Sequence, residues 1–228
     1  MPRFDHPELT VDPRTLDVAP PLRAALPAMS EPVEQPVVTA PLDEPLVAVE
    51  HPNIAVIDAY HRAGWSAARS GTWIRAGAFD RLVAAVEQLP SGFGLSVFDA
   101  WRPLELQAEI YEAAYAAPGL PPGFVAPPSA DPERPPPHLT GGTVDLTLSY
   151  EGRSLALGTG FDAFTPEAAA TAFEDSPGMV RDLRRLLYWS MRSAGFVVLN
   201  QEWWHFEYGT RRWAALTGAP PLYGPALL

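Results

Sequence analysis

The spacing of apolar residues along the chain predicts a domain that combines helices with short strands. Apolar residues in 76–89 recur at the i, i+3, i+4 and i+7 spacing of an amphipathic helix: Phe79, Leu82, Val83, Val86 and Leu89. Residues 177–193 repeat this spacing and are followed by Gly195, a residue type common just after helix ends. Another helix is expected with Pro103 in its first turn, running to about residue 117, because proline is tolerated there.

Short apolar or alternating runs predict the strands. These runs cover residues 53–60, 72–75, 94–98, 143–149, 196–199 and 203–208. Glu151 and Gly152 are typical of a hairpin turn, and Thr165 with Pro166 indicates a short helix. Because helices and strands alternate without a βαβ rhythm, we predict an α+β fold with a small antiparallel sheet flanked by helices.

Two proline-rich stretches interrupt this pattern. Residues 1–45 contain ten prolines and are expected to be extended or disordered, either as a dispensable tail or laid over the domain. The compact domain is therefore assigned to residues 46–228. Residues 118–137 contain nine prolines and lead into His138. A long loop of this kind often serves as a lid or as a binding wall.

Composition and charge narrow the possible partners. With 228 residues, 47% of them hydrophobic, the chain is long enough for one domain with a sizeable core. No apolar run reaches the length of about 18 residues that predicts a membrane span, and residues 1–20 do not resemble a secretory signal, so we expect a cytoplasmic protein. A net charge of -11 argues against binding to nucleic acid or to an anionic membrane. The chain has no cysteine, so histidine and carboxylate groups must hold any metal.

Two short motifs supply such ligands. His138 and Asp145 lie in HLTGGTVD, and Glu202 and His205 lie in EWWHFEYG. Two histidines and one carboxylate make a zinc site with an open fourth position, which is the catalytic rather than the structural arrangement. The remaining carboxylate, Glu202, is suited to accept a proton from zinc-bound water. His138 is expected on a loop edge and Asp145 on the next strand, facing the same cleft.

Each motif also has a purely structural interpretation. His138 alone fits a solvated loop residue, and Glu202 with His205 fits the edge of a tryptophan-rich core. A buried Asp145 would need a partner, because an isolated buried carboxylate is costly. The metal interpretation is favoured because the chain has five histidines, two of which stand beside acids in strand-like segments. Glu207, two residues beyond His205, fits a hydrogen-bond partner of that histidine.

A third motif, FDAWRP, places Arg102 just after a predicted buried strand. An arginine stays protonated and offers several donors, so at a strand end that faces a cleft it can stabilise an oxyanion. Asp99 would then hold the guanidinium in place. The alternative is an ion pair between Arg102 and Asp99 that only fixes the turn.

These motifs, in this order, resemble those of the zinc-dependent D-alanyl-D-alanine dipeptidases, the family of the vancomycin-resistance dipeptidase. The wider superfamily also contains D-Ala-D-Ala carboxypeptidases and the hedgehog signalling domain. The likeness covers residues 53–208. Residues 99–103 match D-x-[YW]-R-P, residues 136–145 are close to S-x-H-x-x-G-x-A-x-D, and residues 202–206 match E-W-W-H-[FY] at every position. A GxxFD block is found at residues 158–162.

The resemblance implies a fold with its zinc site in a central cleft and a small dipeptide, D-alanyl-D-alanine, as substrate. One zinc ion per chain would be bound by His138, Asp145 and His205. Glu202 would be the general base for zinc-bound water, and Arg102 would stabilise the tetrahedral intermediate. Asp162 would bind the free ammonium of the dipeptide. Residues 46–228 would then be the catalytic domain; the native metal, the oligomeric state and the biological role stay open.

The sequence departs from the family pattern at two positions of the first histidine motif. Pro136 replaces the serine that helps to hold the substrate carboxylate, and Thr143 replaces an alanine. Proline offers neither a hydroxyl nor an N–H. Two other functions therefore stay open: a D,D- or L,D-carboxypeptidase acting on cell-wall peptides, and a non-catalytic zinc-stabilised binding domain. Glu202 favours an enzyme, and Asp162 favours a dipeptidase.

Overall fold

The computed structural model describes residues 4–116, 120 and 123–228. Its main sheet runs in the order β2–β4–β5–β8–β7, with β6 paired to the outer end of β5. The strands are β2 (Ile54–Val56), β4 (Phe93–Asp99), β5 (Thr143–Tyr150), β6 (Arg153–Ser154), β7 (Val197–Leu199) and β8 (Glu202–Glu207). A separate ladder joins β1 (Leu46–Ala48) to β3 (Trp73–Arg75).

The predicted α+β class is confirmed, but the sheet is mixed rather than antiparallel. β2 pairs with β4 in parallel, whereas the other pairs of the sheet are antiparallel. The chain between β2 and β4 contains β3 and two helices, and a connection of this length allows the parallel pairing.

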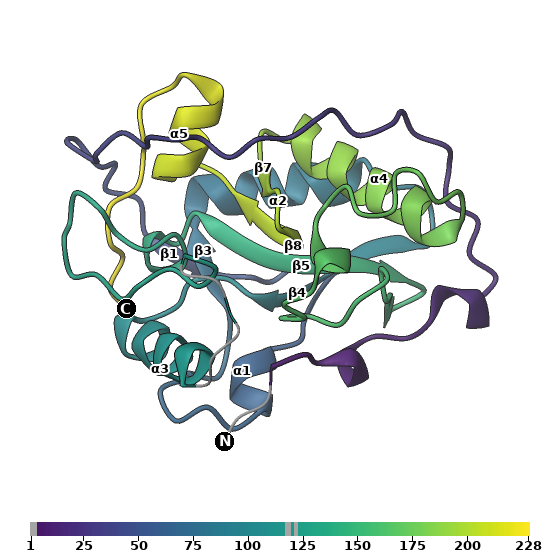
Figure 1. Ribbon diagram of the computed structural model, residues 1–228, viewed down its shortest axis with the longest axis horizontal. Helices are drawn as coiled ribbons and strands as arrows, with labels where there is room; N and C mark the ends of the chain where they lie inside the picture. The colour runs from purple at the N-terminus through teal and green to yellow at the C-terminus, as the bar shows by residue number, and fades with distance from the viewer. Residues whose placement is uncertain (1–3, 117–119, 121–122) are drawn as a thin grey trace.

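Helices cover the sheet (Figure 1). They are α1 (Ala59–Arg62), α2 (Ala76–Glu87), α3 (Leu104–Tyr115), α4 (Met179–Ser193) and α5 (Arg211–Thr217). The predictions for α2 and α4 are confirmed. Pro103 precedes the first turn of α3 rather than lying in it, and the predicted end near residue 117 falls outside the described residues. α1 and α5 were not predicted: the strand expected over residues 53–60 is limited to β2, and its last two residues belong to α1. Thr210 caps α5 by accepting a hydrogen bond from the Trp213 amide.

The central strand β5 separates the hydrophobic core from the polar residues of the cleft. Its residues are buried on both faces apart from Tyr150. Val144, Leu146 and Leu148 belong to the core together with residues of α2 and α4. Because side chains alternate along a strand, Thr143, Asp145 and Thr147 point to the opposite face. This alternation brings a carboxylate to the cleft from the middle of the sheet.

The N-terminal segment, residues 4–45, is extended except for 3-10 turns at Pro7–Leu9 and Pro13–Thr15. It runs along the outside of the molecule past α4 and α5 (Figure 1). The indole of Trp189 donates to Ala24 O at 2.9 Å, and the guanidinium of Arg211 donates to Pro36 O at 2.8 Å. Val18 and Val38 are buried. Among the described residues, no helix has the length and apolar character needed to cross a membrane.

Candidate metal and peptide site

Three predicted ligands meet at the surface of the sheet. His138 lies in a 3-10 turn (His138–Thr140), Asp145 on β5 and His205 on β8, directly opposite Asp145 in the ladder. All three are buried, and one potential ligand atom from each lies within 4.8 Å of the others. The expectation that His138 and Asp145 face the same cleft is therefore confirmed.

Two glycines allow the turn that carries His138 to meet β5. Gly141 ends the 3-10 turn at φ 72°, a backbone conformation that favours glycine. A Cβ on Gly142 would lie 2.3 Å from the Tyr208 carbonyl oxygen, so no larger residue fits there. The HLTGGTVD motif thus places its histidine beside the strand that follows.

Hydrogen bonds assign the nitrogen that each histidine offers to a metal. His138 Nδ1 lies 2.7 Å from Ala100 O, so this nitrogen donates and Nε2 is left facing Asp145 Oδ2 at 3.3 Å. His205 Nε2 lies 3.2 Å from Glu207 Oε1, which leaves Nδ1 facing Asp145 Oδ1 at 3.0 Å. Glu207 is therefore the hydrogen-bond partner of His205 that the sequence indicated.

The residues present fit a divalent cation. Asp145 Oδ1 is buried and accepts no hydrogen bond of good geometry from any described residue, although His205 Nδ1 is close. Burial raises the pKa of Asp145, but the two imidazoles outweigh it and hold the pKa below its usual range. Burial lowers the pKa of His205, but the carboxylates at its two nitrogens raise it to about 10, so a bound metal would have to displace a proton from this imidazole. With that proton lost, two imidazole nitrogens and an ionised oxygen converge on one point, as zinc ligands do.

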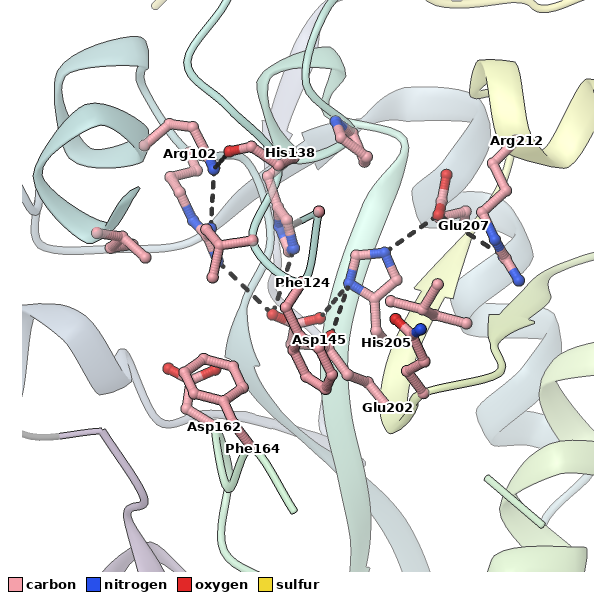
Figure 2. A pocket seen from close by; sticks show the side chains of 18 of the residues that line it. Arg102, Phe124, His138, Asp145, Asp162, Phe164, Glu202, His205, Glu207 and Arg212 are labelled. Carbon is pink, nitrogen blue, oxygen red and sulfur yellow. Dashed lines mark hydrogen bonds and ion pairs between the residues drawn. The ribbon is translucent and has the colours of Figure 1, made fainter. Parts of the chain in front are cut away.

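Glu202 stands beside this group without belonging to it. It is the first residue of β8, and its Oε2 lies 3.7 Å from His205 Nδ1. Burial raises its pKa to about 7. Figure 2 shows Glu202 next to Asp145 and His205. A carboxylate with this pKa can exchange a proton with a reacting group at neutral pH.

Arg102 is held on the other side of the ligand group by a buried network. Its Nε lies 3.0 Å from Asp99 Oδ2, its Nη1 2.9 Å from Gln107 Oε1, and its Nη2 3.2 Å from the Tyr60 hydroxyl. The ladder of β4 and β5 shifts register between Val97 and Asp99. Such a shift re-aims the side chain at the strand end. The ion pair with Asp99 is present, and Arg102 also lines the cavity.

Asp162 lies on the loop after β6 and faces the same cavity. Its backbone is left-handed at φ 60°, and its Oδ2 accepts a hydrogen bond from the Tyr60 hydroxyl at 2.9 Å. Burial raises its pKa well above the usual range, and the neighbouring acids add to this effect. Arg184 of α4 fixes the loop by donating to the carbonyls of Leu157, Glu167 and Ala169.

The cavity that joins these groups has a volume of about 330 Å³. Its lining includes Phe124, Val125 and Pro137 from the proline-rich loop, so the described part of this loop forms a wall. Pro137 rather than Pro136 lines it. In Figure 2, Phe164 lies beside Asp162 on one side of the site, and Arg212 lies on the opposite side, beyond Glu207 as seen from His205.

Some residues of the site were not predicted. Tyr60 and Gln107 contact Arg102 from α1 and α3, and Arg212 reaches Glu207 from α5. Glu31 also lines the cavity, from the N-terminal segment. Tyr60 is the last residue of a predicted strand, which is the only indication of it in the sequence. Gln107, Arg212 and Glu31 belong to no motif that the sequence analysis identified.

The sequence is similar to those of known proteins. The sequence matches the profile of the peptidase M15 family, D-Ala-D-Ala dipeptidase, over residues 76–216. A D-alanyl-D-alanine dipeptidase of Escherichia coli strain K12 is 35% identical over 118 residues, which are 51% of this chain and 56% of that protein. A D-alanyl-D-alanine dipeptidase of Synechocystis sp. is 28% identical over 180 residues, which are 64% of this chain and 73% of that protein.

The aligned part of the chain thus spans little more than half the length of the E. coli relative. The profile match, however, covers more than half of this chain and includes every predicted ligand. The resemblance found in the motifs is confirmed: the chain belongs to the peptidase M15 family of D-Ala-D-Ala dipeptidases.

Proposed function

We propose that this protein is a zinc dipeptidase with D-alanyl-D-alanine as its substrate. The observation that carries the proposal is the convergence of His138, Asp145 and His205 at the cavity, because two histidines and one carboxylate are the ligand set of a catalytic zinc site. When bound there, zinc would supply a Lewis acid that polarises the peptide carbonyl and lowers the pKa of water. The family membership and the two dipeptidase relatives support the choice of substrate.

In this proposal Glu202 is the general base. Its carboxylate takes a proton from the attacking water as the carbon–oxygen bond forms. It then returns that proton to the amine that leaves when the carbon–nitrogen bond breaks. A pKa of about 7, raised by burial, suits both steps at neutral pH. Its position beside the ligand group, rather than within it, leaves the carboxylate free to move a proton.

Arg102 stabilises the negative charge that develops on the carbonyl oxygen. A guanidinium remains protonated in proteins, and contacts with Asp99, Gln107 and Tyr60 hold it in one orientation. A donor that is already oriented needs no reorganisation during the reaction. Asp99 is therefore a positioning residue for Arg102.

Asp162 binds the ammonium group of the dipeptide. A buried carboxylate at the end of the cavity provides a countercharge for a free amino terminus, and Tyr60 orients it. A substrate with further residues on its amino side would bury this carboxylate without a cation, which is costly. This argument favours a dipeptidase over a carboxypeptidase that acts on longer peptides.

The test is release of free D-alanine from D-Ala-D-Ala by zinc-loaded protein, with Glu202→Ala as the control. We expect release that falls by about 10²- to 10⁴-fold in the control, the range for loss of a general base. N-acetyl-D-Ala-D-Ala separates the alternatives, because a carboxypeptidase would cleave it and a dipeptidase would not. Zinc binding without hydrolysis of either compound would instead support a binding domain.

A further inference from the structure

A row of charged side chains leads from His205 to the N-terminal segment. His205 Nε2 lies 3.2 Å from Glu207 Oε1, and the same oxygen lies 3.7 Å from Arg212 Nη1. Arg212 in turn pairs with Glu31. Figure 2 shows Glu207 between His205 and Arg212. The charges alternate along the row, and it joins the site to a residue outside the part matched by the family profile.

Glu31 fixes the orientation of the Arg212 guanidinium. Arg212 Nε lies 2.6 Å from Glu31 Oε2 and Nη2 lies 2.9 Å from Glu31 Oε1, which is a bidentate pair. Nη2 also donates to Val198 O at 2.7 Å. Nη1 is left directed at Glu207, and it has no other partner among the described residues. A planar guanidinium held on one edge presents its remaining nitrogen in a fixed direction.

The N-terminal segment in turn fixes Glu31. The Asn200 amide donates to Glu31 Oε1 at 2.8 Å. On either side of Glu31 the segment is tied to the domain by the bonds of Trp189 to Ala24 O and of Arg211 to Pro36 O. The carboxylate therefore has a defined place, although its segment has no regular secondary structure there.

The row matters because three groups share Glu207: the Thr210 hydroxyl donates to Oε2, while His205 and Arg212 both approach Oε1. It accepts from His205, which sets the tautomer and the basicity of the ligand nitrogen, and it is attracted by Arg212. Glu207 and Arg212 are almost fully buried, so their attraction is weakly screened. Glu31 neutralises part of the Arg212 charge. Without Glu31, Arg212 would draw Glu207 more strongly and weaken its hydrogen bond to His205.

We propose that Glu31 is a positioning residue for the metal ligand His205, acting through Arg212 and Glu207. The N-terminal segment is then a functional part of the site rather than a dispensable tail. This inference rests on the proposed role of His205 as a ligand. It assigns no new chemistry to Glu31, only control over the orientation and basicity of the imidazole.

The test measures zinc affinity by competition with a chelator in the full-length protein. Removal of a direct partner of a ligating histidine costs about 10- to 100-fold in metal affinity, which we expect for Glu207→Gln. Glu31→Gln, one step further away, should cost about three- to tenfold. In the Glu207→Gln background, Glu31→Gln should cost nothing more, because the two residues act along one path. The visible spectrum of the Co²⁺-loaded protein should change in both single variants.

Two controls make the outcome decisive. Glu34→Gln alters an exposed acid three residues away on the same segment and should leave zinc affinity unchanged. His205→Ala should weaken zinc binding more than any other variant; if it does not, the ligand assignment and this inference both fail. If His205→Ala weakens binding while Glu31→Gln has no effect, or has the same effect in both backgrounds, only the role of Glu31 is overturned. If the wild-type protein binds zinc with these variant effects but does not hydrolyse D-Ala-D-Ala, the proposed function fails and the role of Glu31 is upheld.

Discussion

Tyr60→Phe is a sharp test of the proposed substrate site, because it removes one oxygen atom from the centre of a buried network. The Tyr60 hydroxyl accepts from Arg102 Nη2 at 3.2 Å and donates to Asp162 Oδ2 at 2.9 Å. The side chain is 3% exposed, so water does not readily replace the hydroxyl. Burial raises its pKa well above the usual value, which keeps the hydroxyl protonated as a donor.

The magnitude follows from the loss of a hydrogen bond to a charged group, about 1.5–3 kcal/mol. If this loss reduces the binding free energy of the substrate ammonium, KM should rise by about 10- to 100-fold, because a tenfold change corresponds to about 1.4 kcal/mol. The turnover number should change less, because the proposed role of Asp162 is at the ammonium end of the substrate, and Asp99 and Gln107 still hold Arg102 in the variant.

The pH dependence gives a second readout. Burial already raises the pKa of Asp162, and the bond from Tyr60 lowers it, so the variant should have a still higher value. Asp162 binds an ammonium only when ionised. KM should therefore rise as the pH is lowered, and in Tyr60→Phe this rise should begin at a higher pH than in the wild type.

The assay is steady-state release of D-alanine between about pH 6 and about pH 9, an interval that lies between the ordinary pKa values of aspartate and tyrosine side chains, with Tyr150→Phe as the matched control. Tyr150 packs on Phe93 at the far end of β5, so its hydroxyl should not matter. The reasoning is refuted if Tyr60→Phe keeps a wild-type KM, or if the loss falls entirely on the turnover number.

Three further predictions concern the metal, the Asp162 loop and the ion pair of Glu174 with Arg185. Treatment with a chelator should abolish hydrolysis and added zinc should restore it; activity that survives complete metal removal would contradict the zinc mechanism. Arg184→Met should lower the thermal midpoint and raise KM, because Arg184 donates to three carbonyls of the loop that carries Asp162. If calorimetry shows a lowered midpoint while KM stays normal, Arg184 stabilises the fold without positioning Asp162, and the prediction is wrong. Hydrogen bonding with Arg185 lowers the pKa of Glu174, so its stabilisation is present above the unfolded value near 4.5 and is lost as the pH falls through the folded value. Glu174→Gln should therefore reduce the free energy of unfolding by less than about 1 kcal/mol at pH 7 and by a smaller amount at about pH 3, as denaturant titrations at the two pH values can check.

The sequence predicted the parts of this protein that depend on local patterns. The apolar spacing located α2 and α4, and the alternation in TVDLTLSY located β5. The motif residues His138 and Asp145 were expected to share a cleft because only a short turn separates them. Each of these inferences uses residues close together in the chain.

The features that could not be predicted from the sequence depend on contacts between segments that are far apart in the chain. The parallel pairing of β2 with β4 was not predicted, because the apolar run that predicts this short strand does not indicate which strand it joins. Tyr60 meets Asp162 from 102 residues away, and Glu31 meets Arg212 from 181 residues away. Such contacts exist only once the chain has folded, and one sequence alone contains no sign of them.

The register of the central ladder has a consequence for how the protein reaches its native state. Asp145 stands directly opposite His205, two positions from the pair of Thr143 with Glu207. A slip of one residue between β5 and β8 would turn every side chain of the slipped strand to the other face. If Asp145 and His205 bind a metal ion as proposed, that ion can therefore bind only the correctly paired chain. Zinc added during refolding should therefore increase the fraction of molecules in which β5 and β8 are paired in the native register.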